Sequence, residues 1–337
     1  MTETPNGGGL IRVVALTEAG VAQAVFGPLH RHLAHIQEAF RDPSAPRGAP
    51  AYRLTLDAQG DQLTLRTAQG GAAELERAQR IIDALAELAR RKGRVREGEV
   101  LAAISFSEGP NTAPGPMALP QLGGLTLRTP RQVHYVEALR DEALDLIFGA
   151  GPAGTGKTFL AVAAAVEALK QERVDRIIVT RPAVEAGEKL GYLPGDLAEK
   201  VDPYLAPIWD AFRSQMNESD LKTRRERRQI EVAPLAFMRG RTLSNAFVIV
   251  DEAQNATVLQ MKMVLTRLGE GSRMVVTGDP SQVDLVRVDQ SGLAHAISIL
   301  EGLEAVEVIR FATQDVVRHR LVAKIVEAYQ RDEDRHD

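Results

Sequence analysis

The sequence contains no cysteine among its 337 residues. This absence excludes disulfide bonds, thiolate catalysis and zinc held by cysteine, and it favours a reducing compartment. A surplus of positive charge is also lacking, because the formal net charge is -4. No chain-wide positive field therefore indicates binding to nucleic acid, and any such surface would have to be local.

Long hydrophobic runs are missing as well. The longest apolar stretch, residues 159–166, is interrupted by Glu167 and falls well short of the roughly 20 residues that cross a bilayer. Residues 1–9, MTETPNGGG, lack the basic start and the apolar core of a signal peptide. We therefore expect a soluble, cytoplasmic protein that does not bind membranes.

What is present is a globular composition, 44% hydrophobic and 26% charged, with material for roughly two domains. We predict a small α+β domain over residues 1–104, because a strand hairpin at 52–67 is followed by a helical apolar period at 72–91. Residues 105–128 are rich in glycine and proline and are predicted to form a linker. Residues 129–337 make up the second predicted domain.

Short apolar segments alternate with helical stretches through the second predicted domain. These segments are 144–148, 176–180, 247–250, 273–277 and 305–309. Short apolar runs rich in β-branched residues are typical of the buried strands of a parallel sheet with helices on its faces. The predicted fold class of this domain is therefore α/β with a parallel sheet.

A phosphate-binding pattern follows the first of these strands. The pattern G-x-x-x-x-G-K-[ST] is matched in full by Gly151, Pro152, Ala153, Gly154, Thr155, Gly156, Lys157 and Thr158. Glycine reaches the backbone angles that turn N–H groups toward a polyphosphate, and the helix expected from Lys157 points its positive end at the same anion. We predict that Lys157 reaches the β- and γ-phosphates of ATP and that the Thr158 hydroxyl ligates Mg²⁺.

Two carboxylates end a later strand, in FVIVDEAQN at residues 247–255. We predict that Asp251 holds Mg²⁺ and that Glu252 polarises the attacking water. The alternative is an acidic pair that merely faces solvent at the end of a strand. Because no N-K-x-D segment for guanine is present and a glutamate follows the aspartate, we favour an ATPase over a GTPase or a small-molecule kinase.

Several longer stretches of the second domain closely resemble PhoH-like ATPases. They are residues 181–212, 231–255, 266–285 and 315–329, so that the resemblance covers about 129–329 almost continuously. Membership of this family implies a single RecA-like P-loop core without the second core domain of helicases. It also implies homo-oligomers, often rings such as hexamers.

The resemblance also assigns roles to two glutamines. Gln132 resembles the adenine-reading glutamine of related helicases, and Gln282, in the GDPSQ stretch at 278–282, would sense the γ-phosphate. One position departs from the family pattern, because Pro280 follows Asp279 where many relatives carry isoleucine or valine. This change could shift the loop slightly, while Gln282 keeps its place.

Two arginines are candidates for contact with anions. Arg318 is our candidate for a catalytic arginine that acts across a subunit boundary, and a surface pairing with Asp315 is an equally good interpretation. Arg181 directly follows a predicted strand and so is expected to face the ligand crevice. It could contact nucleic acid or a neighbour's nucleotide, or it could pair with Glu185, and the sequence favours neither.

The first domain is similar to the KH-like module that precedes the ATPase in bacterial relatives. Residues 27–30, GPLH, lack the second glycine of the loop with which KH domains clamp nucleic acid, so RNA binding by this module is not predicted. The basic run at 222–228, KTRRERR, could grip phosphates, although such a run is more often a solvated helix face.

Taken together, these patterns predict a Mg²⁺-dependent, ATP-hydrolysing protein that acts in RNA metabolism, by remodelling RNA or maturing ribosomal RNA. The alternative is a regulatory ATPase whose nucleotide state controls the docking of a protein partner, which the resemblance implies is an endoribonuclease of the YbeY type. A nucleotide-binding module without turnover is a third interpretation, against which Glu252 argues.

Overall fold

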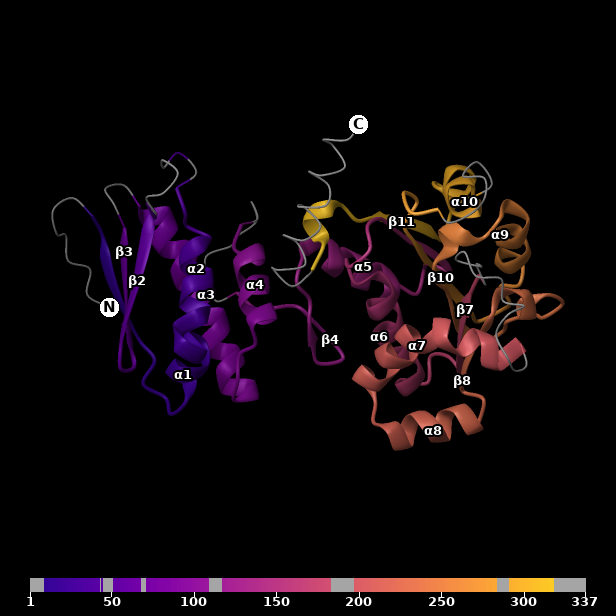
Figure 1. Ribbon diagram of the computed structural model, residues 1–337, viewed down its shortest axis with the longest axis horizontal. Coiled ribbons are helices and arrows are strands. Elements are labelled where there is room, and N and C mark those ends of the chain that lie inside the picture. Colours follow the sequence, from indigo (N-terminus) through magenta and orange to yellow (C-terminus); the bar gives the residue numbers. More distant parts are fainter. Residues whose placement is uncertain are drawn as a thin grey trace. The chain divides into compact units, whose positions relative to one another are not determined.

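The structure is a computed structural model that describes residues 9–42, 44, 51–67, 71–108, 117–182, 197–283 and 291–317, with the side chains of 197–204 left out. The chain divides into two compact units, one that ends at Pro130 and one that begins at Arg131 (Figure 1). The boundaries that we predicted at residues 104 and 128, and the KH-like character of the first part, stay predictions.

The first unit is a three-stranded antiparallel sheet covered by helices. Its strands β1 (Ile11–Ala15), β2 (Leu54–Gln59) and β3 (Gln62–Thr67) lie in the order β1-β3-β2. Its helices are α1 (Val21–Phe26), η1 (Pro28–His30), α2 (Arg31–Glu38), α3 (Ala72–Lys92) and α4 (Glu97–Phe106). The predicted hairpin and the predicted amphipathic helix are both present, and β1 is a strand that the sequence analysis missed.

Helix α3 supplies much of the apolar core of this unit. Leu75, Ile82 and Leu85 lie on its buried face, because side chains three, four and seven residues apart share one side of a helix. The helix ends at Gly93, whose left-handed backbone favours glycine. Residues 105–128 contain the end of α4 and a short hairpin of β4 (Gln121–Leu122) and β5 (Leu125–Thr126).

The second unit is built on a six-stranded parallel sheet. Its strands are β6 (Leu146–Ala150), β7 (Arg176–Arg181), β8 (Ile230–Pro234), β9 (Ala246–Val250), β10 (Arg273–Gly278) and β11 (Val306–Arg310). They lie in the order β11-β6-β10-β9-β7-β8, and each pairs in parallel with its neighbours. This α/β sheet confirms the predicted fold class, a RecA-like core, and it places one strand, β10, between β6 and β9.

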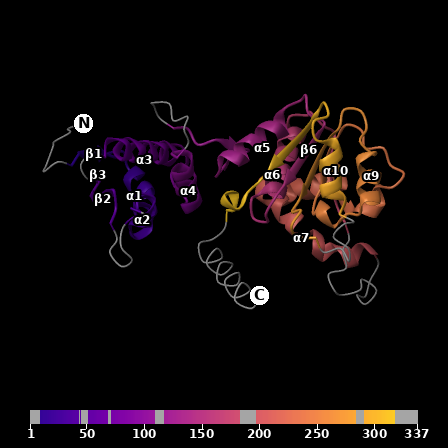
Figure 2. The same cartoon turned by 90° about the horizontal axis from the view of Figure 1, so that it is seen from above.

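Helices cover both faces of this sheet (Figure 2). They are α5 (Pro130–Arg140), α6 (Lys157–Lys170), α7 (Leu197–Gln215), α8 (Glu218–Glu226), α9 (Val258–Leu265) and α10 (Gly292–Leu300), with the short turns η3 (Leu235–Met238), η4 (Ala253–Asn255) and η6 (Thr313–Asp315). Helix α6 packs on β7, β9 and β10. Its run of buried alanines combines the strongest helix propensity with the smallest side chain, which lets the helix lie close to the sheet.

The opposite face of the sheet packs against α9 and α10. Phe148 and Val248 project from the strands into one apolar cluster with Met261 of α9 and Leu293 of α10. The alternate residues of the same strands, Ile147 among them, are buried as well, which is expected of a parallel sheet covered on both faces. This packing fixes the carboxyl ends of the strands, where the site lies.

Strand β8 is the one strand of the second sheet that the sequence analysis missed. Its residues, IEVAP, include a half-exposed glutamate and end in proline, so they lack the continuous apolar character of the other strands. Both features suit the edge of a sheet, where a strand has one unpaired side and proline is tolerated. Within the described residues, no helix has the length and apolarity needed to cross a bilayer.

We expect Phe148→Ala to lower the free energy of unfolding by about 3–5 kcal/mol, because it removes a fully buried ring and leaves a cavity beside the central strand. The matched control is Phe237→Ala, since Phe237 is 47% exposed and its loss should cost less than about 1 kcal/mol. Chemical denaturation of both variants measures the difference. Equal destabilisation by the two substitutions would contradict the core assignment.

Candidate functional site

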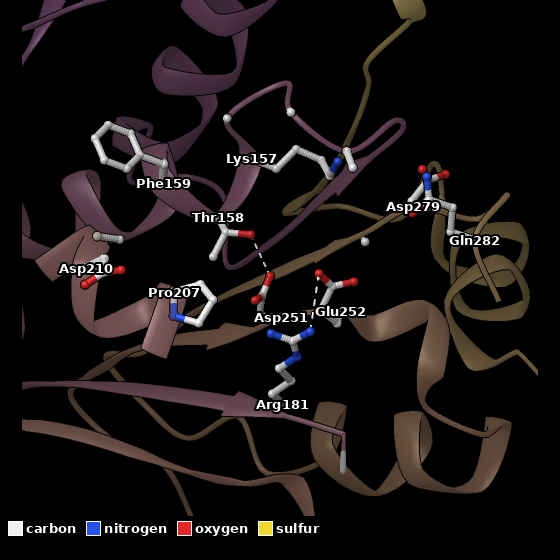
Figure 3. A pocket seen from close by; sticks show the side chains of 15 residues that line it. Lys157, Thr158, Phe159, Arg181, Pro207, Asp210, Asp251, Glu252, Asp279 and Gln282 are labelled. Carbon is white, nitrogen blue, oxygen red and sulfur yellow. Dashed lines mark hydrogen bonds and ion pairs between the residues drawn. The ribbon is translucent and has the colours of Figure 1, made fainter. Parts of the chain in front are cut away.

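A cavity of about 570 Å³ opens where the carboxyl ends of the parallel strands meet the first turn of α6 (Figure 3). Its volume lies within the range of small-molecule sites. In open α/β sheets, ligands bind at this edge because the loops that follow the strands converge there. The charged residues that line it are Lys157, Arg181, Asp210, Asp251, Glu252 and Asp279.

The predicted phosphate loop joins β6 to α6 and forms one wall of this cavity. Gly151 has a φ of 140° and lies so close to the Phe311 carbonyl that an added Cβ would be 2.4 Å from its oxygen. Gly156 caps α6 with a left-handed φ of 86°. Both positions therefore require glycine for physical reasons, as the pattern predicts. The helix that follows begins at Lys157, so its positive end faces the cavity.

The Lys157 ammonium folds back onto the loop. Its Nζ donates to the carbonyl oxygens of Gly151 at 2.6 Å and of Pro152 at 2.8 Å. Burial lowers the pKa of Lys157 below its ordinary value, while the carboxylates of the cavity, Asp279 foremost, act in the opposite direction. A polyphosphate bound beside this ammonium would stabilise its charged form.

Thr158 and Asp251 meet across the cavity, although 93 residues separate them in the chain. The Thr158 Oγ1 donates to the Asp251 Oδ1 at 2.6 Å, and the Thr277 Oγ1 donates to the same oxygen at 2.8 Å. The Asp251 backbone N–H donates to the Thr180 carbonyl at 2.8 Å, which ties the end of β9 to β7. The predicted pair of Mg²⁺ ligands is thus brought into direct contact.

Glu252 follows Asp251 and has a left-handed φ of 50°, which is uncommon for a residue with a side chain. Its Oε2 accepts a hydrogen bond from the Gln254 Nε2 at 2.5 Å, and the Gln254 Oε1 accepts one from the Asp279 backbone N–H at 3.0 Å. Gln254 is 2% exposed and so links the ends of β9 and β10 from within the protein. This link joins residues that follow different strands, so no local sequence pattern indicates it.

Asp279 is a further acidic residue that the sequence analysis did not place in the site. Its Oδ1 accepts hydrogen bonds from the Ser281 backbone at 3.0 Å and hydroxyl at 2.6 Å. Asp279 is 6% exposed, and its Oδ2 is buried without a hydrogen-bond partner among the described residues. A buried carboxylate oxygen without a partner is costly, so this oxygen is suited to a cation or to a water bound to one.

The oxygen ligands of this cavity fit Mg²⁺ better than they fit a metal ion whose ligands all come from protein side chains. Within the described ranges, no group of three or more histidine, aspartate or glutamate side chains is arranged to hold a metal ion. Mg²⁺ usually takes one or two carboxylates, and phosphates and waters complete its shell. Thr158 and Asp251, which both line the cavity, meet that requirement.

The structure separates the remaining predicted residues into two groups. Ala153, Gly154, Gly156 and Gln282 line the cavity. Gly151, Pro152 and Thr155 shape the loop from behind it, and the Thr155 Oγ1 donates to the Pro152 carbonyl at 3.0 Å. The Gln282 backbone N–H donates to the Asp279 carbonyl at 3.1 Å, so the turn that contains Pro280 keeps Gln282 at the cavity.

Gln132, on α5, contacts the phosphate loop rather than the cavity. Its Nε2 donates to the Thr155 carbonyl at 2.9 Å, and the side chain is buried. The amide thereby stabilises the loop from the side of α5. Its adenine-reading role stays a prediction.

Of the two candidate arginines, Arg181 lies within the described residues and Arg318 does not. Arg181, at the end of β7, lies at the cavity with its Nη2 3.6 Å from the Glu252 Oε1. Glu185, the partner that we considered, lies outside the described residues, as does Arg318. The Asp315 Oδ2 accepts a hydrogen bond from the Ala312 backbone N–H at 2.8 Å, within its own turn.

The basic run at 222–228 lies on α8 and the turn after it. Lys222, Arg225, Arg227 and Arg228 are exposed, which is the surface placement that we favoured. Arg225 stacks over the ring of Trp209, with its guanidinium carbon 4.2 Å from the ring centre. Binding of phosphates by this run stays a prediction.

Comparison with known proteins identifies relatives of the second unit. The family model described as "PhoH-like protein" matches residues 124–330, more than half of the chain. A PhoH-like protein of Bacillus subtilis (strain 168) is 56% identical over 207 residues, which cover 61% of this chain and 64% of that protein. Protein PhoH of Escherichia coli (strain K12) is 48% identical over 204 residues, which cover 60% of this chain and 57% of that protein.

The chain thus spans less than two thirds of the length of these relatives. Among solved structures, the Sulfolobus solfataricus SWI2/SNF2 ATPase core in complex with dsDNA aligns with 54% of this chain and 41% of that chain, at 18% identity and a TM-score of 0.33. A TM-score this low supports no inference about function. Because the family model matches more than half of the chain, the chain belongs to the PhoH-like protein family.

Proposed function

We propose that this protein is a Mg²⁺-dependent ATPase that acts in RNA metabolism. The observation that carries the ATPase proposal is the hydrogen bond between Thr158 and Asp251, because it brings the phosphate loop and the acidic end of β9 to one point. Thr158 and Asp251 would hold Mg²⁺ at that point, and the ion would neutralise negative charge that develops on the reacting phosphate. The family assignment supports the same proposal.

The side chains of the cavity divide the work between binding and activation. Lys157 exchanges its carbonyl partners for phosphate oxygens, and the N–H groups at the start of α6 bind the same anion. Thr158 and Asp251 hold the divalent ion, and the Glu252 carboxylate orients the attacking water. Gln282 lines the cavity, and we propose that it responds to the γ-phosphate. Arg318, from a neighbouring subunit of a ring-shaped oligomer, would add positive charge.

Two observations support a role on RNA. The first is the resemblance of Gln132 and the GDPSQ stretch at 278–282 to motifs of related helicases, and the second is the exposed basic run at 222–228. Arginine is well suited to phosphodiester groups because its guanidinium binds two phosphate oxygens at once. A regulatory ATPase that docks a YbeY-type endoribonuclease is the alternative that the experiments below also test.

Lys157→Ala should weaken ATP binding by on the order of 100-fold, because it removes charge-assisted hydrogen bonds to two phosphates. Isothermal titration with ATP and Mg²⁺ measures the change. Lys170→Ala is the matched control, since Lys170 lies in the last turn of the same helix and is exposed. ATP affinity that is equal in the two variants would show that the loop does not bind the phosphates.

Glu252→Gln should lower kcat by roughly 10²- to 10³-fold while ATP binding is retained, because the amide keeps the shape of the carboxylate but cannot polarise water. Steady-state phosphate release and ATP titration separate the two effects. Glu270→Gln, at an exposed glutamate before β10, should leave kcat unchanged. Normal hydrolysis by Glu252→Gln would remove Glu252 from the mechanism.

Single-stranded RNA should raise the ATPase rate severalfold, and RNA affinity should fall by about tenfold between roughly 50 and 200 mM salt as a few counterions are released. Phosphate release with and without RNA, and RNA binding over a salt series, provide the two measurements. An ATPase rate that does not change with RNA but changes when an endoribonuclease partner is added would favour the adaptor role instead.

A further inference from the structure

The cavity contains few positive charges for the ligand that we propose. Among the residues that the structure describes, its lining includes two cationic side chains, Lys157 and Arg181, and four carboxylates, those of Asp210, Asp251, Glu252 and Asp279. A triphosphate brings further negative charge, only part of which a divalent ion neutralises. We therefore expect both cations to contact the phosphates. The phosphate-loop pattern assigns this role to Lys157 but says nothing of Arg181.

Arg181 lies at the carboxyl-terminal edge of the sheet, which is the edge where the phosphates are expected to bind. It is the last residue of β7, and the preceding residue, Thr180, accepts the backbone hydrogen bond of Asp251 at 2.8 Å. The backbone of Arg181 is thus fixed one residue from the anchor of the metal ligand. Its guanidinium lies beside the Glu252 carboxylate (Figure 3).

The contact between Arg181 and Glu252 is one that a phosphate can displace. The 3.6 Å between Arg181 Nη2 and Glu252 Oε1 is longer than a charge-assisted hydrogen bond, which measures about 2.7–2.9 Å. The other carboxylate oxygen, Oε2, is held by Gln254 at 2.5 Å. Glu252 thus keeps its position through Gln254 and its own strained backbone when Arg181 leaves it.

We propose that Arg181 is a catalytic residue that binds the γ-phosphate of ATP from within the same chain, exchanging Glu252 for phosphate oxygens when the nucleotide is bound. The exchange leaves the Glu252 Oε1 available to accept a hydrogen bond from the attacking water. It also places a planar guanidinium where negative charge grows on the γ-phosphate. This inference rests on the proposed ATPase function.

The decisive experiment is a comparison of ATP and ADP binding in a background that does not hydrolyse ATP. Full-length Glu252→Gln and the double variant Arg181→Ala/Glu252→Gln are titrated with each nucleotide in the presence of Mg²⁺. The neutral amide at position 252 removes the ion pair with Arg181 from both variants, so that pair cannot account for a difference between them. We expect Arg181→Ala to weaken ATP binding by about tenfold and ADP binding by less than about twofold.

Two results would overturn the proposal. Unchanged ATP affinity in the double variant would mean that Arg181 acts only through Glu252, as a positioning residue. An equal loss of ATP and ADP affinity would mean that Arg181 stabilises the cavity in general. Circular dichroism of both variants checks that they fold alike.

Turnover measurements supply a second, independent readout. Arg181→Ala in the otherwise unchanged chain should lower kcat by on the order of 100-fold. Arg181→Lys should recover only part of the lost kcat, because lysine keeps the positive charge but lacks the paired N–H donors of the guanidinium. Arg310→Ala is the matched control, since Arg310 makes a bidentate pair with Glu301 on the surface and should leave kcat unchanged. A kcat within about twofold of the unchanged chain for Arg181→Ala contradicts the inference.

Failure of the proposed function is distinguishable from failure of this inference. If the unchanged chain binds ATP without hydrolysing it, the ATPase proposal fails, while the difference between ATP and ADP affinity still reports on Arg181. If the unchanged chain hydrolyses ATP and the binding difference is absent, the assignment of Arg181 alone fails.

Discussion

The site depends on one hydrogen bond, that from the Thr158 hydroxyl to the Asp251 carboxylate at 2.6 Å. It joins the first turn of α6 to the end of β9, and it can form only because β10 alone separates β6 from β9 in the sheet. The intervening strand takes part, since Thr277 of β10 donates to the same oxygen at 2.8 Å. Strand order, which the apolar cores on both faces of the sheet stabilise, thereby sets the position of the proposed metal site.

From this anchor, a chain of polar contacts extends across the carboxyl ends of three strands. Asp251 is tied to β7 through Thr180, and Glu252 is tied to the turn after β10 through Gln254. Asp251, Gln254 and Asp279 are buried, so a partner lost at any of them would leave an uncompensated polar group in a medium of low dielectric constant. Such networks have discrete arrangements, which suits the proposed role of the site in distinguishing a triphosphate from a diphosphate.

Much of this arrangement was predictable from sequence because it depends on local pattern. The glycines of the phosphate loop, the helix that begins at Lys157 and the apolar strand before Asp251 each follow from a few adjacent residues. The contacts of Gln254 with Asp279, and of Arg181 with Glu252, join residues on different strands, and only the order and register of the sheet bring them together. Strand β8 escaped notice because an edge strand needs less apolar surface than a central one.

Whether the proposed catalytic arginine belongs to the same chain or to a neighbouring subunit determines whether ATP hydrolysis requires an oligomer. An arginine that is supplied by a neighbouring subunit makes hydrolysis conditional on a closed ring, so the ring itself is part of the chemistry. Arg181 belongs to the same chain as the phosphate loop and already contacts Glu252, so the charge that it provides does not depend on a neighbour. Assembly would then add the charge of Arg318 to one that is already present, and it would also serve the proposed grip on RNA or on a protein partner. On this view the nucleotide controls the protein through the loosely held pair of Arg181 and Glu252, because the γ-phosphate competes for one member of it.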